Sequence, residues 1–176
     1  MDELLSCTRC QLAATRQRVV VGSGPTSARL LVVGEAPGRT EDEGGEPFIG
    51  ASGRLLFRLL EEETGLTRAD CFVTNVVKCR PPANRPPRNE EIAACAPWLE
   101  AQLAESAHRA LLTVGNTAGR AVFGFTEGIA SVHGQRFERD GRPGIATYHP
   151  AAALRSTSVA RDLRADLKLL LELVAP

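Results

Sequence analysis

Four cysteines are the residues whose type and spacing point most directly to chemistry. Cys7 and Cys10 form a CxxC pair, and Cys79 and Cys95 follow much further along the chain. Four thiolates can hold a tetrahedral zinc ion or a [4Fe-4S] cluster, and a compact pair with two dispersed partners suits the larger cluster. The spacing leaves zinc open, as well as a set of unrelated buried thiols. The fifth cysteine, Cys71, begins an apolar run and is expected to be a packed thiol.

A second group of reactive side chains follows an apolar run over residues 28–33. The run ends at Gly34 and Glu35, and a turn rich in carboxylates, including Glu41, leads to the isolated aromatic Phe48. Packing alone does not explain a strand that ends in a glycine turn with several acids and one aromatic ring. We therefore expect this stretch to form the floor of a site.

A stiff, basic loop follows the second apolar run. Residues 78–88 read KCRPPANRPPR, and the four prolines exclude regular structure because they lack an N–H donor and fix φ. The loop offers phosphate-binding side chains at Lys78, Arg80, Arg85 and Arg88. A metal centre that includes Cys79 would pin this loop against the N-terminal segment, and would therefore organise a nucleic-acid surface.

The elements that must position these residues alternate along the chain. Strands are expected over residues 28–33, 71–77, 110–114 and 144–148, and helices over residues 53–63, 89–103, 116–124 and 159–174. Ser52, Asn116 and Ser158 are the expected helix caps, and Pro97 should kink or restart the second helix. Residues 135–139 and 144–148 flank a DGRP turn that predicts a hairpin.

Strands separated by helices predict a mostly parallel sheet with helices on both faces. Ligands bind such sheets in the crevice beyond the carboxyl ends of the strands. The predicted strand ends carry Glu35, Asn75, Gly115 and His149. The sequence therefore predicts that these four positions, far apart in the chain, meet at one site.

Length and composition limit the number of domains and the kinds of partner that the chain can have. The chain has 176 residues, 43% of them hydrophobic and 24% charged, with 21 basic against 21 acidic side chains. We expect one domain over residues 1–176, and a monomeric, cytoplasmic protein without a membrane partner, because there is no long apolar run and no secretory signal pattern. Zero net charge neither indicates nor excludes a nucleic-acid partner, since local patches decide phosphate binding.

Taken in order, the motifs resemble the family 4 uracil-DNA glycosylases, which are iron-sulfur members of their superfamily. The matching motifs are CxxC at residues 7–10, GEAPGRTED at 34–42, PFIGASG at 47–53, TNVVKCRPP at 74–82, and HPAAALR at 149–155. The resemblance implies an α/β fold, a three-layer α/β/α sandwich with a central four-stranded, mostly parallel sheet. It also implies a [4Fe-4S] cluster whose ligands would be Cys7, Cys10, Cys79 and Cys95.

The implied activity is DNA repair by base excision. The enzyme would flip uracil out of single- or double-stranded DNA and hydrolyse its N-glycosidic bond, leaving an abasic site. We expect a monofunctional enzyme, because no motif places a lysine as a Schiff-base nucleophile. The alternatives are a non-catalytic iron-sulfur module that binds damaged DNA, and a glycosylase of broader specificity for deaminated bases.

The resemblance also implies roles for single residues around the base. Phe48 would stack on the uracil, and Asn75 would donate to O4 and accept from N3–H. Ala36 would lie near C5, where thymine carries a methyl group, and His149 would donate a hydrogen bond to O2 as the base departs. Glu35 or Glu41 would position the attacking water, and the sequence does not decide between them.

The DNA-binding surface is expected to flank this pocket. Leu154 would enter the stack that the flipped nucleotide leaves, and Arg155 would contact a phosphate or base. The arginines of the basic loop and Lys78 would contact phosphates on the other side.

Overall fold

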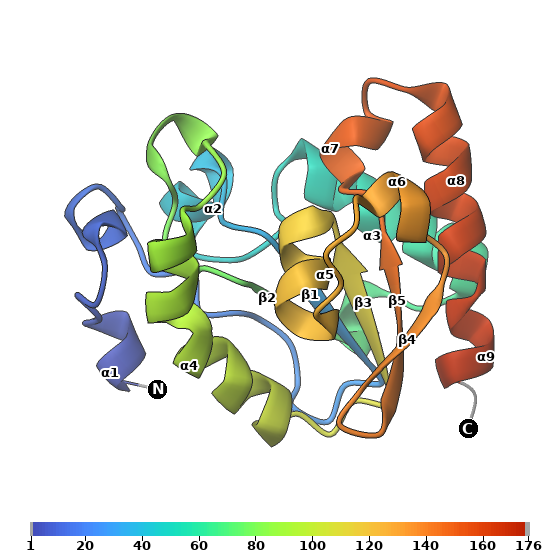
Figure 1. The fold of residues 1–176 in the computed structure, drawn as a ribbon, viewed down its shortest axis with the longest axis horizontal. Coiled ribbons are helices and arrows are strands. Elements are labelled where there is room, and N and C mark those ends of the chain that lie inside the picture. The colour runs from blue at the N-terminus through green and yellow to red at the C-terminus, as the bar shows by residue number, and fades with distance from the viewer. Residues whose placement is uncertain (1, 175–176) are drawn as a thin grey trace.

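Helices and strands alternate along the chain in the computed structural model, which describes residues 2–174 (Figure 1). The strands are β1 (Leu30–Gly34), β2 (Cys71–Asn75), β3 (Ala110–Val114), β4 (Arg136–Arg139) and β5 (Arg142–Thr147). The longer helices are α3 (Ala51–Thr64), α4 (Asn89–Glu105), α5 (Asn116–Phe123) and α8 (Thr157–Lys168). The short helices are α1 (Asp2–Leu5), α2 (Arg39–Gly44), α6 (Ile129–Val132), α7 (Pro150–Ala153) and α9 (Leu170–Val174), and 3₁₀ turns cover Gln11–Ala14, Arg68–Asp70 and Pro82–Asn84.

The sheet has the strand order β2-β1-β3-β5-β4. The first four of these strands run parallel, as expected, and β4 lies antiparallel to β5 at the edge. The expected count of four strands is therefore one too low, because the first arm of the predicted hairpin joins the sheet. Exposed charged residues alternate along β4, which suits a strand with one unpaired edge.

The sheet is buried on both faces, so the three-layer arrangement is confirmed. Along β1, Leu30 and Val32 pack in one core cluster with α3, α8 and α9. Their neighbours Leu31 and Val33 pack in a second cluster with α4 and α5 on the opposite face. This alternation explains why the central strands read as continuous apolar runs. No helix within residues 2–174 is long and apolar enough to cross a membrane.

Three details of the helices differ from the sequence-based expectation. The N-cap of α3 is Gly50 rather than Ser52, because the N–H of Arg54 bonds to the Gly50 carbonyl at 2.9 Å and starts the helix earlier. The N-cap of α8 is Ser156, whose hydroxyl accepts from the N–H of Val159. Pro97 lies inside α4, which runs without interruption from Asn89 to Glu105.

His108 makes the stability of this fold sensitive to acid. Its side chain is only 4% exposed and lies against Arg142, and burial together with that cation lowers the pKa of His108 to about 4. Between the ordinary pKa of about 6.5 and this value, the unfolded chain binds a proton that the folded chain does not. Stability is therefore lost as the pH falls, by about 2 kcal/mol between pH ~7.5 and ~5.

We expect a His108→Gln variant to show a smaller drop in melting temperature between these two pH values than the unchanged protein. Melting at one fixed scan rate at both pH values checks this, and only the difference between the two conditions counts, because the substitution also changes packing. An equal drop in both proteins would contradict the assignment.

Candidate active site

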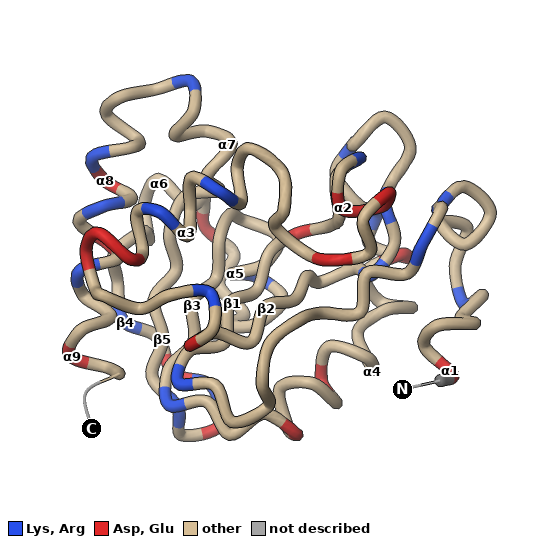
Figure 2. Tube along the Cα trace, turned by 180° about the vertical axis from the view of Figure 1, so that it is seen from behind, with Lys and Arg blue, Asp and Glu red and all other residues tan. Residues whose placement is uncertain are grey.

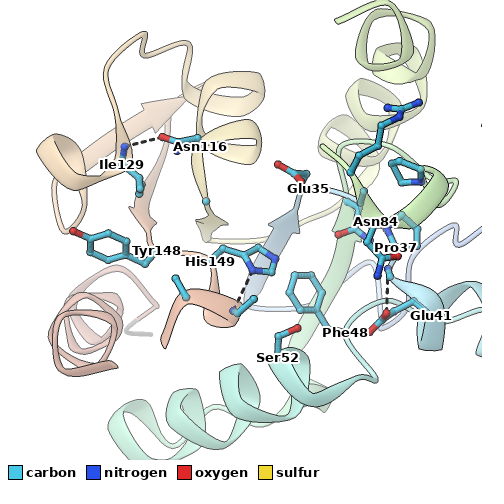
Figure 3. Close-up of a pocket in the computed structure, with 18 of the residues that line it drawn as sticks. Glu35, Pro37, Glu41, Phe48, Ser52, Asn84, Asn116, Ile129, Tyr148 and His149 are labelled. Atoms are coloured by element: carbon cyan, nitrogen blue, oxygen red, sulfur yellow. Dashed lines mark hydrogen bonds between the residues drawn. The ribbon is translucent and has the colours of Figure 1, made fainter. Parts of the chain in front are cut away.

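The carboxyl ends of the four parallel strands open into one cavity of about 620 Å³ (Figure 3). Its walls include all residues expected around the base and the water: Glu35, Ala36, Glu41, Phe48, Asn75 and His149. Gly115, which lies between β3 and α5, also lines the cavity. The parallel topology thus brings together the strand ends that the sequence indicated.

The floor of the cavity depends on a glycine at the end of β1. A Cβ on Gly34 would lie 2.4 Å from both the Asn75 amide oxygen and the Phe48 ring. No side chain fits there, so glycine lets the ring and the amide approach each other across the strand end. Phe48 and Asn75 therefore lie next to each other at the floor of the cavity.

Phe48 has a backbone conformation that a bulky residue rarely adopts. Its φ is +57°, in the left-handed region, and a surrounding structure must hold such a residue in place. Arg68 supplies part of that hold, because its guanidinium donates to the Pro47 carbonyl at 2.6 Å and to the Ser23 hydroxyl at 3.0 Å. The same guanidinium stacks on the Phe57 ring at 4.8 Å. The aromatic ring is thus presented from a fixed loop.

Asn75 presents a buried amide without a protein partner. The residue is only 2% exposed and lines the cavity, and within residues 2–174 no hydrogen bond reaches its side-chain amide. The amide is therefore open to the cavity, where a ligand can pair with it. A carboxamide offers one donor and one acceptor side by side to that ligand.

His149 is held in a defined tautomer. It is the N-cap of α7, and its Nδ1 accepts from the N–H of Ala151 at 3.2 Å. In neutral imidazole the proton then sits on Nε2, which has no partner within residues 2–174 and can donate into the cavity. Burial lowers the pKa of His149, although Glu35 and Glu41 oppose the effect. The ring faces Phe48 with a centroid separation of 6.4 Å.

The two candidate glutamates have different surroundings. Both carboxylate oxygens of Glu41 accept from backbone amides, one from Gly38 at 3.1 Å and one from Gly50 at 2.8 Å. One carboxylate oxygen of Glu35 accepts from the Thr117 hydroxyl, and Glu35 stands near the middle of the cavity beside His149 (Figure 3). Both oxygens of Glu41 thus accept from the backbone of the loop, whereas one oxygen of Glu35 has no protein partner within residues 2–174.

The four expected metal ligands converge on a separate, small pocket. It is lined by Cys7, Cys10, Cys79 and Cys95, together with Arg9, Arg16 and Lys78. Arg16 donates to the Cys79 sulfur at 3.3 Å, and burial raises the pKa of that thiol to about 11. Cys71 packs in the core cluster on the other face of the sheet, as expected. Within the described part of the chain, no three His, Cys, Asp or Glu side chains are arranged to hold a single metal ion.

Comparison of the amino-acid sequence with known protein families identifies the family of this chain. The family model described as the uracil DNA glycosylase superfamily matches residues 21–171. The chain belongs to this superfamily.

Curated members of the superfamily are similar to the chain over nearly its whole length. The type-4 uracil-DNA glycosylase of Sulfurisphaera tokodaii is 38% identical, over 98% of this chain and 82% of its own length. The type-4 enzyme of Archaeoglobus fulgidus is 41% identical, over 97% and 89%. That of Thermotoga maritima is 42% identical, over 89% and 82%. The resemblance to family 4 of the uracil-DNA glycosylase superfamily is therefore confirmed.

In this uracil-DNA glycosylase superfamily member, basic residues occupy both rims of the cavity. Figure 2 shows Lys and Arg positions on the loop after β2 and between α7 and α8. Arg85 and Arg155 line the cavity itself. The Arg85 guanidinium also forms a two-pronged ion pair with Glu91 at 2.7 and 2.9 Å, which fixes its orientation. Leu154 is 52% exposed beside Arg155, as a residue that enters DNA must be.

Lys78 is a correction to the expected DNA-binding set. The side chain is completely buried, and its ammonium donates to the Thr74 hydroxyl at 2.8 Å and to the Asn75 carbonyl at 2.5 Å. Burial lowers the pKa of Lys78 to about 7. A side chain enclosed beneath the strand end cannot reach a phosphate, so Lys78 supports the backbone of Asn75 instead. Arg80 and Arg88, by contrast, retain surface positions in the loop.

Sequence reasoning missed several residues of the site in this superfamily member. Thr117 contacts Glu35 from α5, and Arg68 holds the Phe48 loop from the 3₁₀ turn before β2. Asn116, expected as a helix cap, instead accepts from the N–H of Ile129 at 2.7 Å, and both residues line the cavity. Position alone could have indicated Thr117 and Asn116, because they directly follow a predicted strand end. Arg68 carries no such signal.

Proposed function

We propose that this protein is a monofunctional uracil-DNA glycosylase of base excision repair. It hydrolyses the N-glycosidic bond of uracil in DNA and leaves an abasic site. The family membership supports the reaction class, and the residues of the cavity support the proposed recognition of uracil and the proposed roles of single side chains. The observation that carries the proposal is the Asn75 amide, which has no protein partner within residues 2–174 and faces the same cavity as Phe48 and His149.

The cavity suits the recognition of a flipped uracil. The Phe48 ring gives the base a face on which to stack. The Asn75 amide donates to O4 and accepts from N3–H, whereas cytosine would present a donor where uracil has O4. The wrong base leaves a buried polar group unpaired, which is the strongest basis for rejection. Ala36 lies on the wall and would meet the methyl group of thymine.

The remaining residues suit the chemistry of bond cleavage. Negative charge develops on the departing uracil, and the Nε2–H of His149 would donate to O2 and stabilise it. Glu35 would hold the attacking water, since Thr117 fixes one of its oxygens and both oxygens of Glu41 are used in the loop. Its charge would also favour the cationic character of the sugar. Glu41 then acts by keeping the Phe48 loop in place.

A [4Fe-4S] cluster fits the cysteine pocket. Four thiols from three segments line it, and four thiolates are the ligand set that such a cluster requires. We propose that Cys7, Cys10, Cys79 and Cys95 hold the cluster, and that the cluster fixes the basic loop against the N-terminal segment. Within that arrangement Arg16 stabilises the charge of the Cys79 sulfur through its hydrogen bond.

The DNA strand would cross the rim between the two basic edges. Arg80, Arg85 and Arg88 would contact phosphates on one side, and Arg155 on the other, with Leu154 entering the vacated stack. We propose that the chain acts as a monomer, as one domain over residues 1–176, and in the cytoplasm. Gel filtration of the purified protein alone and with DNA tests the monomeric state.

The proposed function is tested by incubating the purified, cluster-loaded protein with a labelled oligonucleotide that contains one uracil. Hot alkali then breaks the strand at every abasic site. We expect breakage at the uracil position only after incubation, in both single- and double-stranded substrates. Binding without breakage would favour a damage-binding module instead, and release of hypoxanthine or xanthine at a similar rate would indicate a broader glycosylase.

We expect Asn75→Asp to lower kcat/KM for uracil by about 30- to 100-fold. The carboxylate has the shape of the amide but no N–H donor for O4, so a buried polar pair is lost. Single-turnover release of uracil measures the effect. Asn84→Asp is a matched control, because Asn84 lines the same cavity but its side-chain oxygen accepts from Arg80 at 2.7 Å. Equal losses in both variants would contradict the role of Asn75.

A further inference from the structure

The cavity continues past His149 into a compartment that the proposed base site does not use. Asn116, Ile129 and Tyr148 line this part. Figure 3 shows Tyr148 and Ile129 on the opposite side of His149 from Phe48. The whole cavity, at about 620 Å³, is several times larger than a pyrimidine base. A uracil that stacks on Phe48 and accepts from His149 therefore leaves this compartment open.

Tyr148 is the main aromatic surface of the compartment. It is the only tyrosine in the chain and is half-buried directly after β5. Its ring packs on the His133 ring with a centroid separation of 4.7 Å and a tilt of 41°. Within residues 2–174 no hydrogen bond reaches the Tyr148 hydroxyl. The ring is thus supported by a neighbouring ring and exposed to the cavity, as a surface for stacking is.

A buried carboxylate supports this ring. Both oxygens of Asp166 lie 3.1 Å from His133 Nδ1, and the Thr147 hydroxyl donates to Asp166 at 2.5 Å. Asp166 is only 4% exposed, and a Cβ at Gly134 would come within 2.6 Å of its carboxylate. Burying a carboxylate is costly unless it is hydrogen-bonded, so its two partners matter. Through them Asp166 fixes the backbone before Tyr148 and the ring against which Tyr148 packs.

Polar groups beside the ring suit a nucleotide. The Asn116 side-chain oxygen is used by the N–H of Ile129, which leaves its NH₂ group as a donor toward the cavity. Arg155 lines the same cavity and carries a positive charge. An aromatic face, an amide donor and a cation on the wall of the same cavity are the kinds of group that hold single-stranded nucleic acid without strict sequence choice.

We propose that the Tyr148 compartment binds the base of one nucleotide that flanks the flipped uracil. Tyr148 is its stacking platform, and His133 and Asp166 are positioning residues that act through Tyr148. This rests on the proposed function, because the flanking base reaches the compartment only when a uracil occupies the Phe48 end. The compartment then favours single-stranded or locally opened DNA, in which the neighbouring base is also free to leave the stack.

The test combines a change in the enzyme with a change in the DNA. Tyr148→Ala and Tyr148→Phe are compared with the unchanged protein on three uracil oligonucleotides: one with normal neighbours, one with an abasic analogue on the 5′ side of the uracil, and one with it on the 3′ side. We expect Tyr148→Ala to lower kcat/KM about 10- to 100-fold on the normal substrate, the factor that one base–aromatic stack contributes. Tyr148→Phe, which keeps the ring, should recover most of this factor.

The decisive result is the dependence on the neighbour. On one of the two abasic substrates, kcat/KM of the unchanged protein should fall by the same factor. On that substrate Tyr148→Ala should have the same kcat/KM as the unchanged protein. His133→Ala and Asp166→Asn should show part of the loss with the same substrate dependence. A loss that is equal on all three substrates would overturn the proposal. It would mean that Tyr148 only supports the conformation of the His149 loop and contacts no neighbouring base.

A binding measurement separates this proposal from the glycosylase function. The probe is an oligonucleotide with 2-aminopurine next to a 2′-fluorinated deoxyuridine, which resists cleavage. Stacking on Tyr148 should change the 2-aminopurine fluorescence with the unchanged protein and not with Tyr148→Ala, and an identical change in both would overturn the proposal. Failure of the unchanged protein to release uracil from the normal substrate would instead count against the proposed function.

Discussion

Replacement of Glu35 by glutamine is expected to lower kcat for uracil release by about 10²- to 10⁴-fold, the usual contribution of a positioned general base. Glutamine has the same shape but cannot take a proton from water or stabilise a cationic sugar. The Thr117 hydroxyl can still donate to the side-chain oxygen of the new amide, so the fold around it should be kept. Single-turnover kinetics with saturating enzyme measure the chemical step directly.

Glu41→Gln is the matched control for this prediction. An amide has one acceptor oxygen, so the variant cannot accept from both the Gly38 and Gly50 amides, and one partly buried N–H loses its partner. We expect a loss of about 1–3 kcal/mol in stability, seen as a lower melting temperature, with a smaller fall in kcat than in Glu35→Gln. If Glu41→Gln were the slower enzyme while Glu35→Gln turned over normally, the roles of the two glutamates would be reversed.

The general position of the site could be predicted because it depends on a simple rule. A parallel sheet collects the carboxyl ends of its strands at one edge, so Glu35, Asn75 and His149 could be placed together without knowing any contact between them. The apolar runs that form β1, β2 and β3 are buried on both faces and therefore stand out in the sequence.

The environment of single side chains could not be predicted in this way. Lys78 looked like part of a basic surface, yet its side chain turns under the strand end toward Thr74. His133 had no partner in any motif, because Asp166 lies on a distant helix and the pair forms only when α8 packs on the sheet. Local patterns report burial and periodicity, whereas these contacts depend on tertiary packing.

The choice between the two glutamates shows the same limit. Glu35 and Glu41 stand in one motif and have the same chemistry, so their spacing carries no preference. Only the donors around each carboxylate separate them, and those donors come from the turn itself for Glu41 and from α5 for Glu35. The proposed roles of the two residues therefore rest on where the hydrogen-bonding capacity of each carboxylate is already used.

His149 should likewise act through its one free donor. We expect His149→Asn to lower kcat by about 10²- to 10³-fold, because the Nε2–H that stabilises the departing uracil is removed. Asparagine is a favourable N-cap, so it can still accept from the N–H of Ala151 and keep the start of α7. The affinity for DNA with a 2′-fluorinated deoxyuridine should change little, since the lost interaction strengthens only as the bond breaks.

Comparison with His149→Ala separates catalysis from structure. Alanine removes both the donor and the cap, so it should lose a similar factor in kcat and in addition about 1 kcal/mol of stability. Because burial lowers the pKa of His149, any step in kcat that comes from protonation of this residue should lie below the ordinary range of a histidine. If His149→Asn kept its rate while only His149→Ala slowed, the histidine would serve as a helix cap, and the donor to uracil O2 would have to come from another group on the cavity wall.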